Sequence, residues 1–132
     1  MKHVYRLMSV FALTALFVAG IAAADNHKAD VHSTAGFQGP KANTGTAQHT
    51  CENGKSILRV SSDFKVPDTP APTWRVVDSK GTVYTLDAFK IKGGEKREVM
   101  VPAYVKDIAK VQVYCAWAEV LLGEAGFSSA VK

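Results

Sequence analysis

The chain has 132 residues, of which 47% are hydrophobic, and it carries a formal net charge of +4. This length provides for one domain with a modest core and leaves no room for a second domain of ordinary size. Lysines and acidic residues are interspersed along residues 25–132, so the positive charge is spread over the surface and a nucleic-acid partner is not expected.

Residues 1–24 have the pattern of a secretory signal peptide. Lys2 and Arg6 form a short basic start, and the uncharged run that follows ends in three alanines at Ala24. We therefore expect cleavage after Ala24 and a periplasmic or secreted mature chain of 108 of the 132 residues. The alternative is an uncleaved membrane anchor, but the run is only marginally long for that, so we expect no membrane span in the mature chain.

The mature chain begins with a polar segment. Residues 25–36 are small and hydrophilic, which predicts a flexible polar tail because such a segment buries too little apolar surface to become ordered. The β domain is expected to cover residues 37–132.

The tail carries a possible metal-binding sequence. After cleavage, Asp25, Asn26 and His27 would present a free amine, two backbone amides and an imidazole. This square-planar nitrogen set suits Cu(II) or Ni(II), so copper binding through the mature amino terminus is one hypothesis. The alternative is an ordinary polar tail.

Residues 53–54, Asn-Gly, are the strongest short signal for a β-hairpin, and they lie between two runs of alternating residues. A two-residue turn there places Cys51 opposite Ser56 and His49 opposite Leu58. Because alternate residues of a strand share a face, Cys51 and His49 would both face the core. His49 is therefore a candidate metal ligand, although a histidine on a hairpin is more often a surface or edge residue.

The middle of the chain predicts short strands. Three prolines within residues 67–72 exclude a helix or a central strand and indicate a connection over the surface or the end of a sheet. Strand-like runs follow at residues 74–77, 82–86 and 98–101, and only residues 103–109 suggest a helical turn. Seven or eight short strands with frequent turns predict an all-β fold, a single small sandwich or barrel.

The apolar stretch at residues 110–127 carries the second cysteine. Val111, Val113 and Cys115 share one parity with Trp117, so the alternation points Cys115 toward a core. An inward-facing cysteine is inert packing, half of a disulfide, or a site for redox chemistry.

Cys51 and Cys115 are the two cysteines of a chain expected in an oxidising compartment. The first possibility is a structural disulfide, which would close a loop of about 64 residues and contribute roughly 3–5 kcal/mol in the chain-entropy model. The others are inert free thiols, a redox-active thiol or disulfide, or Cys115 as the ligand of a cofactor, for which haem and copper are the candidates.

Other chemistry-bearing residues give no catalytic pattern. The sequence lacks C-x-x-C, H-E-x-x-H, G-x-S-x-G and glycine-rich phosphate loops, and its carboxylates are scattered singly. These absences favour a protein that is not an enzyme, without deciding the question. Six aromatic residues are expected in core and edge packing rather than in a ligand platform: Phe64, Trp74, Tyr84, Tyr104, Tyr114 and Trp117.

Three segments, taken in their order along the chain, resemble a known family. They are residues 58–72 (LRVSSDFKVPDTPAP), 98–104 (EVMVPAY) and 111–127. The chain resembles the electron-transfer DM-thirteen family, small extracytoplasmic domains often found alongside DOMON modules. The resemblance implies that the cysteine of the closing strand, here Cys115, is the functional residue, acting as a bare redox thiol or as a ligand to a prosthetic group.

Two positions depart from that family. Tyr114 stands where the family typically has tryptophan, and Cys51 is not part of its pattern. Our first hypothesis is an exported β domain with a redox or electron-transfer role centred on Cys115 and an unidentified redox or envelope partner. The alternative is a non-catalytic cell-envelope binding or structural module with a passive Cys51–Cys115 disulfide.

Overall fold

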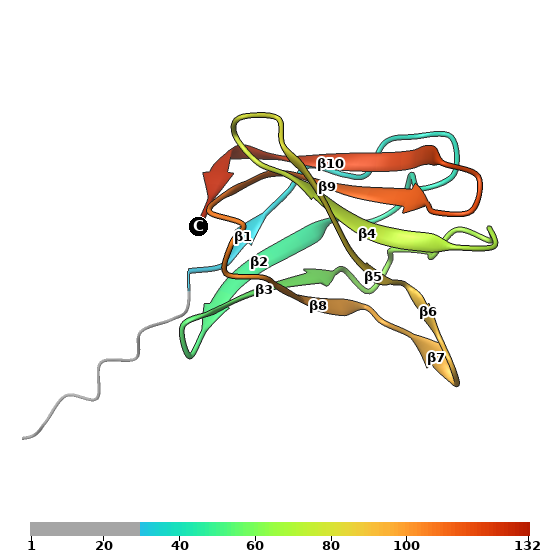
Figure 1. The fold of residues 1–132 in the computed structure, drawn as a ribbon, viewed down its shortest axis with the longest axis horizontal. Coiled ribbons are helices and arrows are strands. Elements are labelled where there is room, and N and C mark those ends of the chain that lie inside the picture. The colour runs from blue at the N-terminus through green and yellow to red at the C-terminus, as the bar shows by residue number, and fades with distance from the viewer. Residues whose placement is uncertain (1–29) are drawn as a thin grey trace, which may run out of the picture.

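The computed structural model describes residues 30–132, which form a β-sandwich (Figure 1). The strands in this range are β1 (His32–Ser33), β2 (Ala47–Glu52), β3 (Lys55–Val60), β4 (Pro72–Val77), β5 (Val83–Ala88), β6 (Lys90–Ile91), β7 (Gly94–Glu95), β8 (Glu98–Val101), β9 (Ile108–Cys115) and β10 (Val120–Val131). The predicted all-β fold is confirmed. The strand number exceeds the expected seven or eight because β1, β6 and β7 have only two residues each.

Some predictions fall on residues that the structure does not describe. The signal peptide, the first part of the polar tail, and the copper-binding tripeptide Asp25-Asn26-His27 all lie outside residues 30–132. Within the described range, no helix has the length and apolar character needed to cross a membrane.

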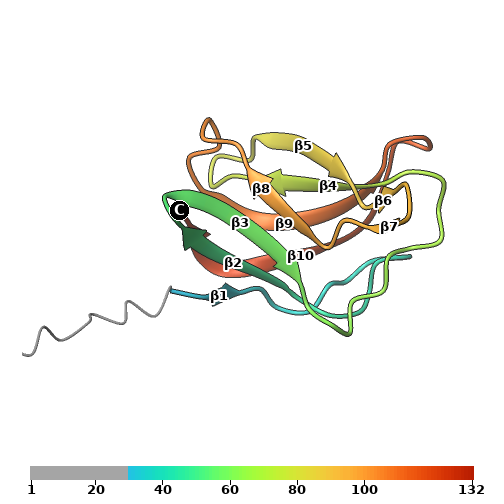
Figure 2. The same ribbon diagram turned by 90° about the horizontal axis from the view of Figure 1, so that it is seen from below.

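Two four-stranded antiparallel sheets stack face to face. One has the order β1-β2-β3-β8 and the other β10-β9-β4-β5, while β6 and β7 form a small ribbon of their own. Figures 1 and 2 show the second sheet lying over the first, with the core between them. Residues that alternate along β4 and β9 fill this core because successive side chains of a strand point to opposite faces.

The β2–β3 hairpin has the predicted register. Asn53 and Gly54 adopt φ values of 51° and 74°, the left-handed conformation that a type I′ turn requires. His49 pairs with Leu58, and Cys51 pairs with Ser56. The prediction of register from the two turn residues is therefore confirmed.

Aromatic rings form the centre of the core. Trp74 is completely buried, and its ring stacks on Phe89 with centroids 4.4 Å apart. Phe64 stacks on the other side of this pair, with its centroid 5.5 Å from that of Phe89. The indole Nε1 of Trp74 donates a hydrogen bond of 2.9 Å to the carbonyl of Lys96, so burial leaves no unpaired indole donor.

Residues 34–42, here called the clasp, close one side of the sandwich. The amide of Thr34 donates to the carbonyl of Ala47 in β2, and the amide of Ala35 donates to that of Gly126 in β10, each at 2.9 Å. The clasp thus connects both sheets.

The clasp and β1 correct the expected start of the domain. The β domain does not begin at Phe37, because His32 and Ser33 already pair with β2. Close backbone contact holds the clasp against β10: a Cβ atom on Gly39 would lie 2.4 Å from the Cα atom of Gly123. The missing side chains of Gly39 and Gly123 allow this close contact, which the hydrophobicity of the sequence does not predict.

The end of the apolar stretch also differs from expectation. The chain turns immediately after Cys115, where the Glu119 amide donates 2.8 Å to the Cys115 carbonyl and Glu119 has φ 56°. Trp117 lies in this turn and is 76% exposed, so its predicted place in the core is wrong. Tyr104, 63% exposed, is likewise outside the core. The helical turn predicted at residues 103–109 is limited to one hydrogen-bonded turn, closed by the Val105 amide donating 3.0 Å to the Pro102 carbonyl, and β9 begins at Ile108.

Candidate functional site

Cys115 is the last residue of β9 and faces the interior, as the alternation predicted. It is 1% exposed. Its strand partners are Val120 in β10 and Pro72 in β4. The cysteine therefore lies where the β9–β10 turn meets the proline segment.

Backbone amides of the turn and of the proline segment affect the pKa of Cys115. Hydrogen bonding from the Ala118 amide, and to a smaller extent from the amides of Ala71 and Trp117 and from the Thr69 hydroxyl, lowers the pKa of the thiol, while burial acts in the opposite direction. Such donors stabilise the negative sulfur because successive N–H groups in a turn form an anion-binding concavity. This arrangement favours the thiolate, the reactive form of cysteine.

The turn places these donors by a simple mechanism. The Ala116 amide donates a hydrogen bond of 2.9 Å to the Ala71 carbonyl, which joins the end of β9 to the segment before β4. The chain then reverses, so the next amides, those of Trp117 and Ala118, return toward the sulfur. The Thr69 hydroxyl oxygen is buried, and its one partner among residues 30–132 is the Cys115 thiol.

Cys115 borders a cavity of about 390 Å³ with mostly apolar walls. This volume falls within the range of small-molecule sites. Pro40, Lys41, Thr69, Pro70, Cys115, Trp117, Ala118, Val120, Leu121 and Leu122 line the cavity. We call this cavity the Cys115 pocket; its walls come from the clasp, the proline segment and the β9–β10 hairpin.

Apolar side chains at the Cys115 pocket are unusually exposed. Trp117, Val120 and Leu121 are 76%, 48% and 42% exposed, respectively. Single exposed apolar residues are normal on a protein surface, but adjacent ones that border a cavity mark a site of interaction.

Cys51 does not belong to this site. The prediction that Cys51 is buried in the core is wrong. Cys51 lies on the same side of β2 as buried His49, yet it is exposed. It is the next-to-last residue of β2, beyond the pairing of β1 with β2, which ends at His49. Its thiol donates to the carbonyl of Lys132 at 3.4 Å.

The two cysteines lie at opposite ends of the sandwich, and both are free. Cys51 contacts Lys132, the neighbour of Val131, and Val131 pairs with Ile108 at the start of β9. Cys115 is seven residues farther along β9, roughly 23 Å at the rise of an extended strand. Figure 1 shows the β2–β3 turn and the end of β9 far apart. A disulfide needs Cα atoms within about 7 Å, so the hypothesis of a Cys51–Cys115 staple is wrong.

His49 is a buried polar residue of the core, 1% exposed. Its Nε2 atom hydrogen-bonds the Ser56 hydroxyl at 2.8 Å, whereas Nδ1 is buried without a partner among the described residues. Burial, and secondarily the charge of His32, lowers the pKa of His49. No group of three His, Cys, Asp or Glu side chains suited to a metal occurs within residues 30–132, so a metal role for His49 lacks further ligands there.

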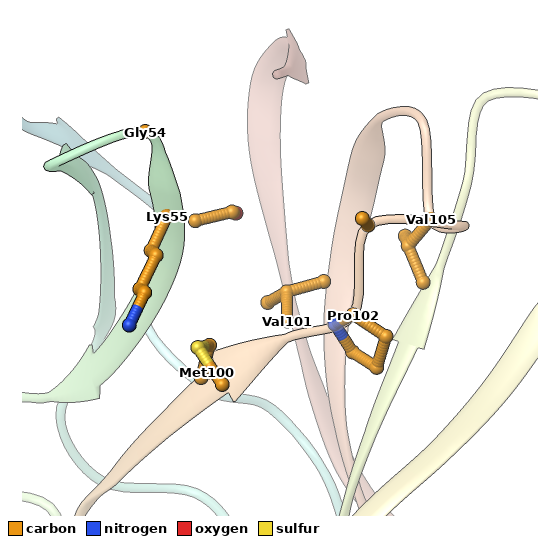
Figure 3. A pocket seen from close by; sticks show the side chains of 8 residues that line it. Gly54, Lys55, Met100, Val101, Pro102 and Val105 are labelled. Atoms are coloured by element: carbon orange, nitrogen blue, oxygen red, sulfur yellow. The ribbon is translucent and has the colours of Figure 1, made fainter.

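Two smaller cavities, each of about 280 Å³, offer less chemistry. Figure 3 shows one of them, between β3 and the segment that follows β8, with Met100, Val101 and Pro102 on its wall and no thiol, imidazole or carboxylate. The other contains Asp78 and Asp107, whose oxygens already accept hydrogen bonds from neighbouring turn residues. The Cys115 pocket is therefore the strongest candidate site.

Sequence reasoning identified Cys115 but missed most of its surroundings. The proline segment was recognised as a connection, without any signal that Thr69 and Pro70 would border the cysteine. Lys41 gave no signal at all, because its position depends on how the clasp lies against β10. Comparison of the chain with models of known families, with curated proteins and with solved structures finds no match.

Proposed function

We propose that this chain is an exported β domain whose function is thiol-based redox chemistry at Cys115. The observation that carries the proposal is a buried thiol on the wall of an apolar cavity, and hydrogen bonding from backbone amides that lowers the pKa of this thiol supports it. A structural cysteine needs neither thiolate-stabilising donors nor a neighbouring cavity. The resemblance of three segments to the electron-transfer DM-thirteen family also supports a role for this cysteine.

In the proposed role, an external oxidant takes two electrons from the Cys115 thiolate, which becomes a sulfenic acid while the oxidant is reduced. The thiolate is the species that attacks an oxidant, so amide donors that favour the thiolate raise its concentration at neutral pH. Cys51 does not serve as the second thiol of an internal disulfide because of its distance. Reduction of Cys115 therefore depends on an external thiol or protein partner.

The side chains of the pocket also bear on the two candidate cofactors. Within residues 30–132, Cys115 is the only residue lining the cavity that offers a thiolate, imidazole or carboxylate. One thiolate is the ligand that a haem iron takes from some proteins, so this donor set fits haem. Copper redox sites use several such ligands, so the set does not fit copper. Bare thiol chemistry requires no group beyond those present.

The proposal predicts unusual reactivity of Cys115 in the folded protein. We would measure the rate of iodoacetamide alkylation against pH in Cys51→Ser, which retains only Cys115. The midpoint should lie below the value of about 8.5 for an ordinary thiol, and unfolding the protein in urea should restore that value. Cys115→Ser, which retains only Cys51, is the matched control for protein behaviour and reagent access.

The same measurement separates the proposal from its alternative, a binding module with an inert cysteine. The apolar cavity alone would suit such a module. A folded Cys51→Ser protein whose thiol resists both alkylation and peroxide, or titrates at or above the ordinary value, would reject a redox role for Cys115.

A further inference from the structure

We propose that the Cys115 pocket takes an organic hydroperoxide with an apolar chain and a carboxylate, such as a fatty-acid hydroperoxide, in preference to hydrogen peroxide. This inference rests on the proposed thiol function and names its oxidant. It combines three features of the cavity: its apolar walls, a lysine that forms no ion pair within residues 30–132, and the buried sulfur at its wall.

The apolar walls select for an apolar oxidant. Trp117, Val120 and Leu121 are exposed around the cavity, and Leu122 lies buried behind them. Apolar chain that covers these side chains is removed from water and gains about 25 cal/mol per Å². Hydrogen peroxide gains nothing from such walls, because it is small and polar.

Lys41 supplies the complementary charge for an anionic group. It is exposed, lines the cavity and takes part in none of the ion pairs formed among residues 30–132. No other lysine, arginine, aspartate or glutamate from the described part of the chain lines this cavity. The hydrogen bond of 3.1 Å from its backbone amide to the Leu122 carbonyl fixes where its side chain begins. An amphiphile with its chain over the apolar wall can therefore pair its carboxylate with the Lys41 ammonium.

The reaction balances without a cofactor. The Cys115 thiolate attacks the terminal oxygen of the hydroperoxide, an S–O bond forms, and the O–O bond breaks. The leaving alkoxide takes one proton from water, so the sulfur becomes a sulfenic acid and the hydroperoxide becomes an alcohol. The Thr69 hydroxyl lines the cavity beside Cys115, and once the thiolate is consumed it can donate a hydrogen bond to this alkoxide.

An external thiol completes the cycle. It condenses with the sulfenic acid to give a mixed disulfide and water, and a second thiol then releases Cys115 with formation of the external disulfide. Cys51 lies at the far end of β9, so it does not replace the external thiol within one molecule.

The test compares three oxidants on Cys51→Ser protein. Sulfenic acid formation at Cys115 would be followed by trapping and mass spectrometry with hydrogen peroxide, linoleic acid hydroperoxide and its methyl ester, each below its micellar concentration. We expect the ester to react about tenfold faster than hydrogen peroxide. The acid should exceed the ester by about threefold, the size of one exposed ion pair.

Two variants with matched controls identify the source of each preference. Lys41→Gln should remove the difference between acid and ester, whereas Lys55→Gln, a change at another exposed lysine outside the pocket, should preserve it. Leu121→Ser should slow both lipid hydroperoxides and leave hydrogen peroxide unchanged. Ile91→Ser, also at an exposed apolar position but in β6, should alter none of the rates.

The outcomes separate the two proposals. If none of the three oxidants modifies Cys115 in the folded protein, thiol redox chemistry itself is rejected. If hydrogen peroxide reacts as fast as the lipids, or Lys41→Gln and Leu121→Ser leave the rate ratios unchanged, only the inferred oxidant class is rejected.

Discussion

Cys115 and His49 are both buried and titratable, and their pKa values are lowered for different physical reasons. Amide donors offset the burial of Cys115 and lower its pKa. His49 receives one hydrogen bond partner, Ser56, and its pKa is lowered mainly by burial. The surroundings thus favour the charged form of the cysteine and the neutral form of the histidine.

The His49 environment predicts a loss of stability in acid. Its folded pKa lies below the unfolded value of about 6.5, so the unfolded chain binds more protons as the pH falls below that value. Stability should therefore be full above about pH 6.5 and decline below it. Urea unfolding at about pH 7.5 and about pH 5.5 measures this decline.

His49→Gln provides the comparison for this prediction, because glutamine cannot titrate but can bond to Ser56. The variant should lose less stability between the two pH values than the unmodified protein does. His32→Gln should reduce the decline only in part, since the charge of His32 is the smaller cause of the lowered pKa. Identical pH dependence in all three proteins would show that His49 does not govern acid stability.

At the scale of elements, the clasp decides the shape of the Cys115 pocket. It contributes Pro40 and Lys41 to the wall and lies against β10 through glycine contacts. A Cβ atom at Gly123 would lie 2.0 Å from the carbonyl oxygen of Ala42. The nearest atoms are the backbone and the Cβ atom of Ala42, so no flexible side chain can move away to make room.

Gly123→Ala should therefore displace the clasp. We expect a loss of about 1–3 kcal/mol in the free energy of unfolding, together with a changed alkylation rate at Cys115. Gly126→Ala is the control in the same strand, because its added Cβ would meet nothing within 4 Å, and its effect should stay within about 0.5 kcal/mol. Equal stability of the two variants would contradict the close packing of clasp and β10.

The sequence predicts one of the two hairpins, β2–β3, and not the other, β9–β10. The β2–β3 hairpin followed from two adjacent turn residues, Asn53 and Gly54, because the conformation of a short turn sets the register of both strands. The β9–β10 hairpin was not predicted. Its turn at residues 116–119 contains apolar residues and no glycine, so the apolar run resembled one continuous strand.

At the scale of the whole molecule, the aromatic cluster packs β4 against two connecting segments, the one after β3 that holds Phe64 and the one between β5 and β6 that holds Phe89. Phe89 is completely buried between Trp74 of β4 and Phe64. Removal of its ring would leave a cavity that two large neighbours cannot fill by small movements. The stability of the sandwich therefore depends on this residue more than on any exposed aromatic side chain.

Phe89→Ala should cost about 3–5 kcal/mol in the free energy of unfolding, the usual range for truncation of a buried aromatic residue. Denaturant unfolding followed by tryptophan fluorescence measures it directly, since Trp74 contacts the lost ring. Ile91→Ala, at a position 52% exposed, should change stability by less than about 0.5 kcal/mol. A loss below about 1 kcal/mol for Phe89→Ala would show that the cluster is not central to the fold.

The sequence by itself determined the class of fold, the register of β2 and β3 and the inward orientation of Cys115, because these follow from side-chain alternation and from turn residues close together in the chain. Only the tertiary structure decided that Cys51 is exposed, and that Lys41, Thr69 and the β9–β10 turn meet around Cys115. The physical reason is distance along the chain: no local pattern records where separate segments meet or where one sheet ends over another.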